Sequence, residues 1–256
     1  MKKIKMSALV LAAASIASTG VMAQSSKTNA WEGAYGQVAV GYGTITPSIP
    51  SGSAAVPAGA LFQSPSLSPA FTGTTSASNV NNINTVIGNI AGGYNFAINS
   101  QYVLGIGVSY DPGASASATG QLGVTAPVNP YLGPASGQLF HSETATYQMK
   151  NVYSVTLNPG YSIDKDRLAY LMLGYTGATV GLSSPGIAYN TINLNGYTVG
   201  LGYKQMVSES IFMLGEIKYG SFGQKTATSS IGGVVPVSQP LSANGMEFLV
   251  GVGYRF

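Results

Sequence analysis

The strongest constraint on the fold of this chain is an alternation of apolar with small or polar residues that repeats every second position. The clearest run ends the chain, where one face carries Phe248, Val250, Val252, Tyr254 and Phe256 and the other carries Glu247, Leu249, Gly251, Gly253 and Arg255. Six similar runs lie near residues 35–42, 85–96, 102–110, 152–158, 196–203 and 211–219. Successive side chains of a β-strand point to opposite faces, so the chain is predicted to be all-β.

An eighth run, over residues 168–180, is apolar on both faces, so its pattern leaves the register open. The connections between the eight runs alternate in length. The short ones are 99–100, 164–166 and 208–210, and the long ones are roughly 44–82, 111–144, 182–190 and 221–244. Short turns at one end and long connections at the other are typical of an eight-stranded antiparallel up-and-down transmembrane β-barrel.

Proline placement agrees with eight strands. Twelve of the 13 prolines fall in the four long connections, and Pro159 is the exception. An interior proline removes a hydrogen bond from a closed sheet, so we expect Pro159 to lie near a rim, where a bulge absorbs it. A ten-stranded barrel would need a hairpin within residues 118–140, and Pro127, Pro130 and Pro134 argue against it.

The N-terminal segment has the composition of an export signal. Three lysines precede an apolar run from Met6 to Ala17, and the small residues up to Ala23 suit signal peptidase. The apolar run is shorter than the roughly 20 residues that a membrane-spanning helix needs. We therefore predict a cleaved signal peptide over residues 1–23 and a single barrel domain over 24–256.

Charge is scarce in this chain. Only 7% of the residues are Asp, Glu, Lys or Arg, where about 25% is ordinary for a soluble protein. Without the three lysines of the predicted signal peptide, eight basic residues face eight acidic ones (11 − 3 against 8), so no basic surface for nucleic acid is expected. The apolar faces of the runs carry almost no charge, whereas the opposite faces are rich in Gly, Ser, Thr and Asn. This division favours a barrel with hydrocarbon outside and small, polar side chains inside.

Aromatic residues cluster at both ends of the predicted strands. The short-turn ends carry Tyr94, Phe96, Tyr102, Tyr161, Tyr203, Tyr254 and Phe256, and the long-connection ends carry Tyr42, Tyr110, Tyr147, Tyr175 and Tyr219. Aromatic rings gather where a barrel crosses the two membrane interfaces. We therefore predict two aromatic girdles.

Four short motifs add a family resemblance. They are Gly92-Gly93-Tyr94-Asn95-Phe96, Pro159-Gly160-Tyr161, the Gly-Leu-Gly-Tyr at 200–203 and the ending Gly253-Tyr254-Arg255-Phe256. With them, nearly all of 30–256 outside the loops resembles the outer-membrane β-barrels of the OmpA transmembrane-domain, OmpX and opacity-protein type.

The resemblance implies a location in the outer membrane of a Gram-negative cell, with short periplasmic turns and long extracellular loops. It also implies that Phe248, Val250, Val252, Tyr254 and Phe256 form the signal recognised by the barrel-assembly machinery. No peptidoglycan-binding domain is expected after the barrel.

Charged residues also lie on the predicted inner faces: Lys150, Lys204, Glu216, Lys218, Glu247 and Arg255. A turn at 208–210 would place Lys204 opposite Leu214 and diagonal to Glu216, within reach of long side chains. We expect these charges to form a salt-bridged plug, because eight strands leave little lumen. A gated pore for small solutes is the alternative.

Catalytic groups are few. The single histidine lies in His141-Ser142-Glu143, but adjacent residues of a strand face opposite sides. Hydrolysis needs a nucleophile and a base within hydrogen-bond reach, and a third group that orients the base. The sequence therefore predicts no enzyme, and it predicts neither a cofactor nor a metal site.

The first long connection, 44–82, contains no charged residue, five prolines and many small residues. This composition predicts disorder or loose packing, with Leu61, Phe62, Leu67 and Phe71 as candidate anchors for a surface ligand. We predict a monomer that contacts membrane lipid and lipopolysaccharide and has a structural or surface-interaction role. A small-solute porin is the second reading, and a lipid-modifying enzyme is a distant third.

Overall fold

The computed structural model describes residues 28–60, 69–113 and 117–256, so the predicted signal peptide lies outside the described residues. Eleven strands form one sheet. They are β1 (Gly33–Ser48), β2 (Gly52–Val56), β3 (Phe71–Ser78), β4 (Ile83–Ala97), β5 (Tyr102–Gly113), β6 (Ala118–Thr125), β7 (Leu139–Ser162), β8 (Arg167–Ser184), β9 (Ile187–Met206), β10 (Ile211–Ile231) and β11 (Val235–Arg255). A short 3₁₀ helix, η1 (Pro130–Ala135), joins β6 to β7. Within the described ranges, no helix is long and apolar enough to cross a membrane.

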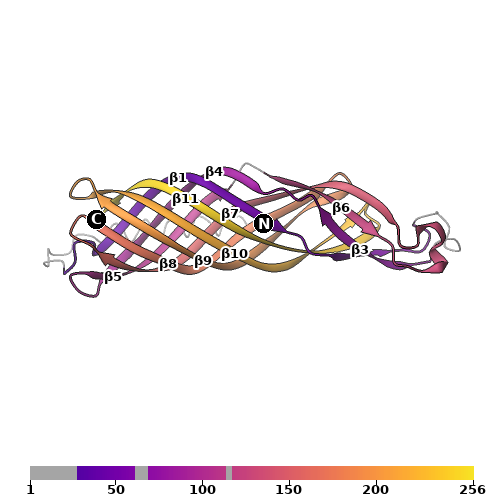
Figure 1. Ribbon diagram of the computed structural model, residues 1–256, viewed down its shortest axis with the longest axis horizontal. Coiled ribbons are helices and arrows are strands. Elements are labelled where there is room, and N and C mark those ends of the chain that lie inside the picture. Colours follow the sequence, from indigo (N-terminus) through magenta and orange to yellow (C-terminus); the bar gives the residue numbers. More distant parts are fainter. Residues whose placement is uncertain (1–27, 61–68, 114–116) are drawn as a thin grey trace, which may run out of the picture.

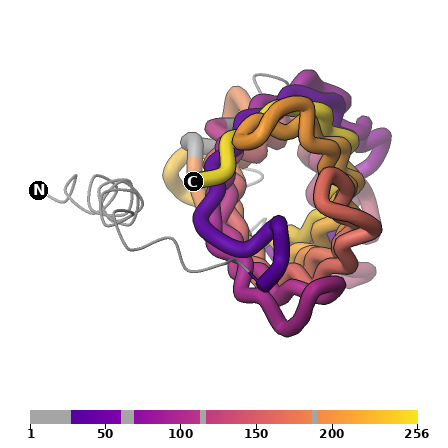
Figure 2. Tube along the Cα trace, turned by 90° about the vertical axis from the view of Figure 1, so that its left-hand side faces the viewer, coloured from indigo at the N-terminus to yellow at the C-terminus, as the bar shows by residue number. Residues whose placement is uncertain are grey.

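The strands close into a tube. Near the short turns, antiparallel pairs link β1, β4, β5, β7, β8, β9, β10 and β11 in that order, and β11 pairs again with β1. The predicted eight-stranded antiparallel barrel is therefore confirmed for this end of the molecule, which we call the lower ring. Figure 2 shows its closed outline along the tube axis.

A second ring of strands continues the tube beyond the first, with its β9–β10 ladder interrupted between Phe222↔Gly196 and Ile231↔Ile187. In it, β7 pairs with β6, β6 with β3, β3 with β2 and β2 with β11, while β7 to β11 run through from the lower ring. The three short strands thus take the places of β1, β4 and β5, and this upper ring again has eight strands. Figure 1 shows β3 and β6 at the far end of the long tube, away from the short turns.

The upper ring corrects two expectations about the long connections. Residues 44–82 were predicted to be loose, but β1 reaches Ser48 and β2 and β3 form a paired hairpin. The hairpin within 118–140 exists as well, because β6 pairs with the start of β7. Its three prolines lie in the 126–138 connection, where they remove no ladder hydrogen bond. Sequence composition missed these strands because most of their residues are small or are threonine, so neither face stands out as apolar.

Strand β11 shows how the two rings differ. Its odd-numbered residues face inward along the whole strand. In the upper ring the inward residues include Val237, Leu241 and Ala243, and the outward ones are Pro236, Ser238, Pro240, Ser242 and Asn244. From Met246 onward the outward residues are all apolar, and the inward ones include Glu247, Gly251 and Gly253. The apolar face therefore changes from inside to outside between Asn244 and Met246, without any break in the strand.

The outward apolar residues of the lower ring form a belt around the tube. Val38, Val40, Ile90, Ile106, Leu171, Leu201, Ile217 and Val250 are all exposed members of it. Along β11 the belt runs from Met246 to the end of the chain, which at about 3.3 Å per residue and a strand tilt of about 40° gives a height of about 25 Å. This height matches the hydrocarbon-facing band of a membrane barrel.

The run 168–180, whose register the sequence left open, is resolved by the pairing of β8. Leu168, Tyr170 and Met172 face inward and are buried, whereas Leu171 and Leu173 face outward.

A bulge in β7 corrects the placement of two residues. The register against β8 shifts between Lys150 and Tyr153, next to Asn151, which has a positive φ of 52°. A shift of one residue exchanges the two faces of a strand. As a result Tyr147 is buried inside rather than exposed in a girdle, and Lys150 points outward rather than into the lumen.

Pro159 lies within β7, and no bulge accompanies it. The β7–β8 register is the same on both sides, at Leu157↔Leu173 and Gly160↔Tyr170, while Asn158 and Pro159 make no ladder pair with β8. The expected bulge at Pro159 is therefore wrong, and the missing proline N–H is accommodated as a short interruption of one ladder.

The change of face along β11 generates a prediction for the protein in lipid vesicles. Val250→Arg, which places a charge in the belt, is expected to lower the free energy of unfolding by about 2–4 kcal/mol. Ser242→Arg, on the same face of the same strand but in the upper ring, is expected to change it by less than about 0.5 kcal/mol. Urea titration of both variants checks this, and equal losses would contradict the assigned boundary.

Candidate functional site

The candidate site is the interior of the tube, because binding, conduction or closure all depend on what fills it. At the short-turn end, residues before β1 fold into the mouth of the lower ring. The Asn29 side-chain oxygen accepts hydrogen bonds from the Trp31 backbone N–H (2.9 Å) and the Ser162 hydroxyl (3.0 Å). Trp31 is buried and meets Phe212 edge to face, with ring centroids 5.9 Å apart. Trp31 and Phe212 therefore occupy this mouth, and we call the pair the aromatic stopper.

Lys204 is buried directly above the stopper among aromatic rings. Its Nζ lies 3.7 Å from the centroid of the Tyr35 ring, 4.8 Å from that of Phe212 and 5.1 Å from that of Tyr170. Ring faces attract a cation by their quadrupole, more strongly where water is excluded. Lys204 is held by these rings, and it adds its own bulk to the closure of the lumen.

Glu216 lies in the same layer but forms no ion pair within 4 Å in the described part of the chain. Its Oε1 accepts hydrogen bonds from the Tyr170 hydroxyl (2.6 Å) and from Gln37 Nε2 (2.9 Å). The predicted register is confirmed, since Lys204 lies opposite Leu214. The expected salt bridge between Lys204 and Glu216 is replaced by ring and hydroxyl contacts.

A second charged layer lies near the junction of the two rings. Lys218 Nζ is 3.0 Å from Glu247 Oε2, and Asp111 Oδ1 accepts a hydrogen bond of 2.7 Å from Asn89 Nδ2. Lys218, Glu247 and Asp111 line one enclosed cavity of about 40 Å³, which has room for a few water molecules at about 10–15 Å³ each. Here the predicted salt-bridged plug does hold a direct ion pair.

Arg255 does not join this interior network. It lies at the rim, where its guanidinium donates hydrogen bonds to the carbonyl oxygens of Ala30 and, at 2.8 Å, of Glu209. Its role is to tie the end of β11 to the neighbouring turn and to the segment before β1.

The interior of the upper ring is apolar. Fourteen buried side chains form one cluster, to which Tyr147, Met149, Val180, Leu182, Leu194, Phe222 and Leu241 contribute the largest groups. Burial raises the pKa of the Tyr147 phenol, which therefore stays neutral. A pocket beside this cluster measures only about 10 Å³, so the upper ring is filled like a protein core.

Apart from Tyr147, the predicted girdle residues lie on the outside of the lower ring. Tyr94, Phe96, Tyr102, Tyr203 and Tyr254 are exposed near the short turns, and Tyr42 and Tyr219 are exposed near the junction. Tyr110 is half-buried, and its hydroxyl donates to Asn151 Oδ1 at 2.9 Å. The residues of the predicted assembly signal, from Phe248 to Phe256, are likewise outward and exposed. Their recognition by assembly machinery stays a prediction.

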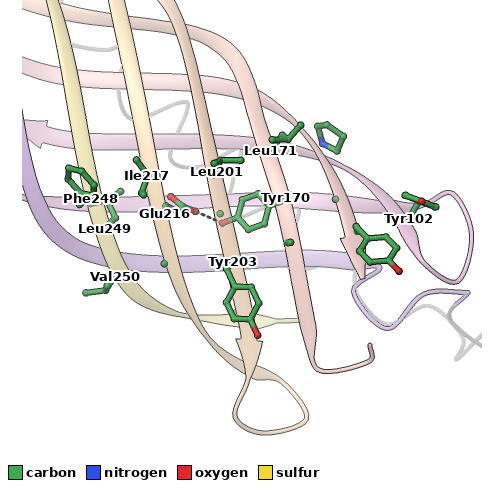
Figure 3. Close-up of a pocket in the computed structure, with 16 residues that line it drawn as sticks. Tyr102, Tyr170, Leu171, Leu201, Tyr203, Glu216, Ile217, Phe248, Leu249 and Val250 are labelled. Atoms are coloured by element: carbon green, nitrogen blue, oxygen red, sulfur yellow. Dashed lines mark hydrogen bonds between the residues drawn. The ribbon is translucent and has the colours of Figure 1, made fainter. Parts of the chain in front are cut away.

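The outward face also contains a hollow of about 810 Å³ in the lower ring, whose lining residues are drawn in Figure 3. Its floor is made of small outward positions, including Ala169 and Gly215, and its rim includes Leu171, Leu201 and Tyr203. Below the floor, Figure 3 shows the hydrogen bond between Tyr170 and Glu216.

The His141 region holds a carboxylate at its centre. Glu143 accepts hydrogen bonds from the Ser184 hydroxyl (2.5 Å) and the Gly186 N–H (2.9 Å), and its Oε1 is 3.7 Å from His141 Nε2. A hydrolytic triad places the imidazole between hydroxyl and carboxylate. Here Glu143 instead fastens the β8–β9 turn to β7.

Several interior residues were missed by sequence reasoning. Asp111 was assigned to a loop, although the inward positions Val103 to Ser109 of β5 lead to it at the same period of two. Trp31 precedes the first alternating run, and no pattern predicts that it folds back into the mouth. Gln37 and Tyr170 carry no charge, so a pattern of charged residues does not include them.

Comparisons with known proteins agree with this architecture. The family described as an outer membrane protein β-barrel domain matches residues 9–256. Among curated proteins, none matches the sequence at a significant level.

Similar chains are found among solved structures. The outer membrane protein OprG of Pseudomonas aeruginosa is 15% identical, with a TM-score of 0.51, over 88% of this chain and 97% of its own. The attachment invasion locus protein Ail of Yersinia pestis is 14% identical, with a TM-score of 0.39, over 88% and 99%. The outer membrane protease OmpT of Escherichia coli is 10% identical, with a TM-score of 0.46, over 87% and 96%. At these identities, only the likeness to OprG supports the fold, and none of the three indicates a function.

The junction layer generates a prediction about interior charges. Lys218→Met is expected to cost about 3–5 kcal/mol of unfolding free energy, because it leaves the buried Asp111 and the partly buried Glu247 without a cation. Glu247→Gln is expected to cost less, since Asp111 remains on the same cavity as Lys218.

Arg167→Gln is the control, because it breaks the exposed ion pair with Asp164. In this pair, hydrogen bonding to Arg167 lowers the Asp164 pKa. The control should change the free energy of unfolding by less than about 1 kcal/mol. Denaturant titration compares the variants, and a larger loss for Glu247→Gln would contradict the assignment.

Proposed function

This chain belongs to the outer membrane protein β-barrel domain family, and we propose that it serves as a closed, non-conducting stalk that presents its hairpin tips to other surfaces. In the family's architecture the short turns face the periplasm and the long hairpins lie outside the cell. The lower ring then spans the outer membrane, and the upper ring stands above it.

The observation that carries the proposal is the apolar core of the upper ring. A barrel that only needed flexible surface loops would not require fourteen buried apolar side chains beyond the membrane. This burial gives the extension a stability of its own, because apolar area removed from water contributes about 25 cal/mol per Å². The outward side chains there are mostly polar, as in Ser238, Ser242 and Asn244 of β11, so the extension is suited to water outside.

Closure of the lumen supports the non-conducting role over a porin. The Trp31 and Phe212 stopper fills the periplasmic mouth, the Lys218–Glu247 pair lies at the junction, and the apolar cluster fills the upper ring. Two pockets in the interior measure only about 10 and 40 Å³. A hydrated solute needs a continuous polar path, and an apolar constriction excludes water.

The connection between β6 and β7, residues 126–138, is the best-defined tip. Asn129 caps η1, accepting from the Tyr131 N–H at 3.0 Å, and Leu132 is buried beneath it. Val128 and Tyr131 are 89% and 80% exposed, and the segment carries no charge. Exposed apolar side chains on a well-ordered uncharged loop are suited to contact with a neutral surface.

The candidate anchors in 44–82 take different places. Phe71 packs edge to face on Phe140, with ring centroids 5.7 Å apart, and so belongs to the stalk rather than to a contact surface. Leu61, Phe62 and Leu67 lie outside the described residues. The contact role is therefore proposed for Val128 and Tyr131.

The proposal includes neither an enzymatic activity nor a cofactor. The order of the Ser184, Glu143 and His141 group supports this, because a carboxylate rather than an imidazole lies at its centre. It includes a monomeric barrel that contacts phospholipid and lipopolysaccharide and is inserted by the barrel-assembly machinery. Cleavage of the export signal after Ala23 remains a prediction.

Lumen closure leads to an expected electrical result. Refolded protein in planar bilayers should show no steady conductance, and liposomes that contain it should not swell in sugar solutions. Protein-free vesicles prepared in parallel provide the baseline. A steady current that changes with Glu216→Gln would show a conducting lumen and overturn the proposal.

The tip leads to a binding prediction. The double variant Val128→Ser with Tyr131→Ser should reduce attachment of nanodisc-embedded protein to cell surfaces or to lipopolysaccharide about tenfold, since central aromatic anchors dominate contact energy. Added salt should leave attachment unchanged, because the tip is uncharged. Val207→Ser, an equally apolar exposed change at a periplasmic turn, serves as the control. Unaltered attachment of the double variant would remove the tip from the proposal.

A further inference from the structure

The outward hollow of the lower ring is shaped by one row of paired residues. Antiparallel pairs connect Tyr102 to Tyr161, Tyr161 to Ala169, Ala169 to Tyr203, Tyr203 to Gly215 and Gly215 to Val250, across six neighbouring strands. Ala169 and Gly215 are small and the others are large, so the row dips at two points. The hollow follows this row, and its volume of about 810 Å³ lies in the range of roughly 300–1,000 Å³ typical of ligand sites.

The position of the two ends of the row restricts what can fill it. Tyr102 begins β5 beside a periplasmic turn, at the level of the girdle. Val250, the most exposed residue of the terminal run, lies well inside the apolar belt. The hollow therefore leads from the interfacial level on the periplasmic side toward the middle of the hydrocarbon layer (Figure 3).

The chemistry of the wall agrees with an apolar occupant. Leu171, Leu201, Ile217, Phe248 and Val250 line the hollow, while tyrosines line its periplasmic end. Pro159 also lines the hollow, and its backbone nitrogen carries no hydrogen to donate. Beside the periplasmic end, the Tyr203 hydroxyl donates to Gln205 at 2.9 Å, so polar groups are available at headgroup level.

We propose that this hollow is a binding site for one acyl chain of a phospholipid from the periplasmic leaflet. The chain enters beside the tyrosines with its headgroup at the girdle, and its methylene groups lie over Ala169 and Gly215. This site is independent of the stalk function, because it faces the lipid and no tip residue lines it, while Tyr170 and Glu216 of the lumen lie beneath its floor.

Two glycines provide a matched pair of variants. A Cβ built on Gly215 would meet no atom within 4 Å, and the same is true of Gly88 on β4. Both positions point outward from the apolar belt, but only Gly215 lies in the hollow. Gly215→Leu therefore fills the site without a clash, whereas Gly88→Leu adds the same side chain elsewhere.

The test measures retained lipid. Wild type, Gly215→Leu, Ala169→Leu and Gly88→Leu are refolded into vesicles of phosphatidylethanolamine and phosphatidylglycerol, released in mild detergent and weighed by native mass spectrometry. Wild type and Gly88→Leu should retain one phospholipid per barrel. Gly215→Leu and Ala169→Leu should retain about tenfold less, which corresponds to about 1.4 kcal/mol.

Three results would overturn the proposal. They are wild type without retained lipid, equal retention in Gly215→Leu and wild type, and a wild-type dimer that Gly215→Leu converts to monomer, since a second copy would then occupy the hollow. Heat-dependent gel migration confirms folding of each variant, and Ala169→Leu replaces Gly215→Leu if the latter does not fold.

Discussion

The structure depends on closure of the hydrogen-bond ladders into rings. In the membrane, no water is available to an unpaired backbone N–H or C=O, so each strand of the lower ring must have a neighbour on both sides. The pairing of β11 with β1 supplies the last of these neighbours. Once the ring is closed, side chains alternate between lipid and lumen, and the positions of the belt, the girdles and the interior charges follow from this alternation.

The same alternation of side chains fits the two environments along the tube, hydrocarbon and water. Strands β7 to β11 pass from hydrocarbon into water, and their sequences move the apolar residues from the outer to the inner face at the crossing. In β11 this happens without a bulge, while β7 and β10 shift register near the same level. The upper ring can then pack a core such as that of a soluble protein, and the lower ring can keep polar and charged groups where lipid does not reach them.

Much of the fold could be predicted from the sequence, because a period of two is visible wherever one face is apolar and the other is not. The terminal run, the short turns and the inward direction of Glu216 and Glu247 all follow from it. The upper ring could not be predicted in this way, since strands such as β2 and β3 consist largely of Gly, Ala, Ser and Thr on both faces. The face of Tyr147 and Lys150 depends on a bulge that pairing creates and no local pattern marks. Within the site, Lys204 was correctly placed opposite Leu214, but its ring partners come from strands distant in sequence, including Tyr35 and Tyr170.

The way the three short strands replace their longer counterparts has a mechanical consequence. Along β7 to β11 the wall of the tube is continuous from periplasmic turn to extracellular hairpin. On the opposite wall the chain leaves one strand and begins another, at 49–51 between β1 and β2 and at 79–82 between β3 and β4. A sideways load on the tip is therefore resisted by strands that run the full length of the tube on one side and by short joints on the other. The stalk has a stiff flank and a compliant flank, and bending is directed toward the jointed one.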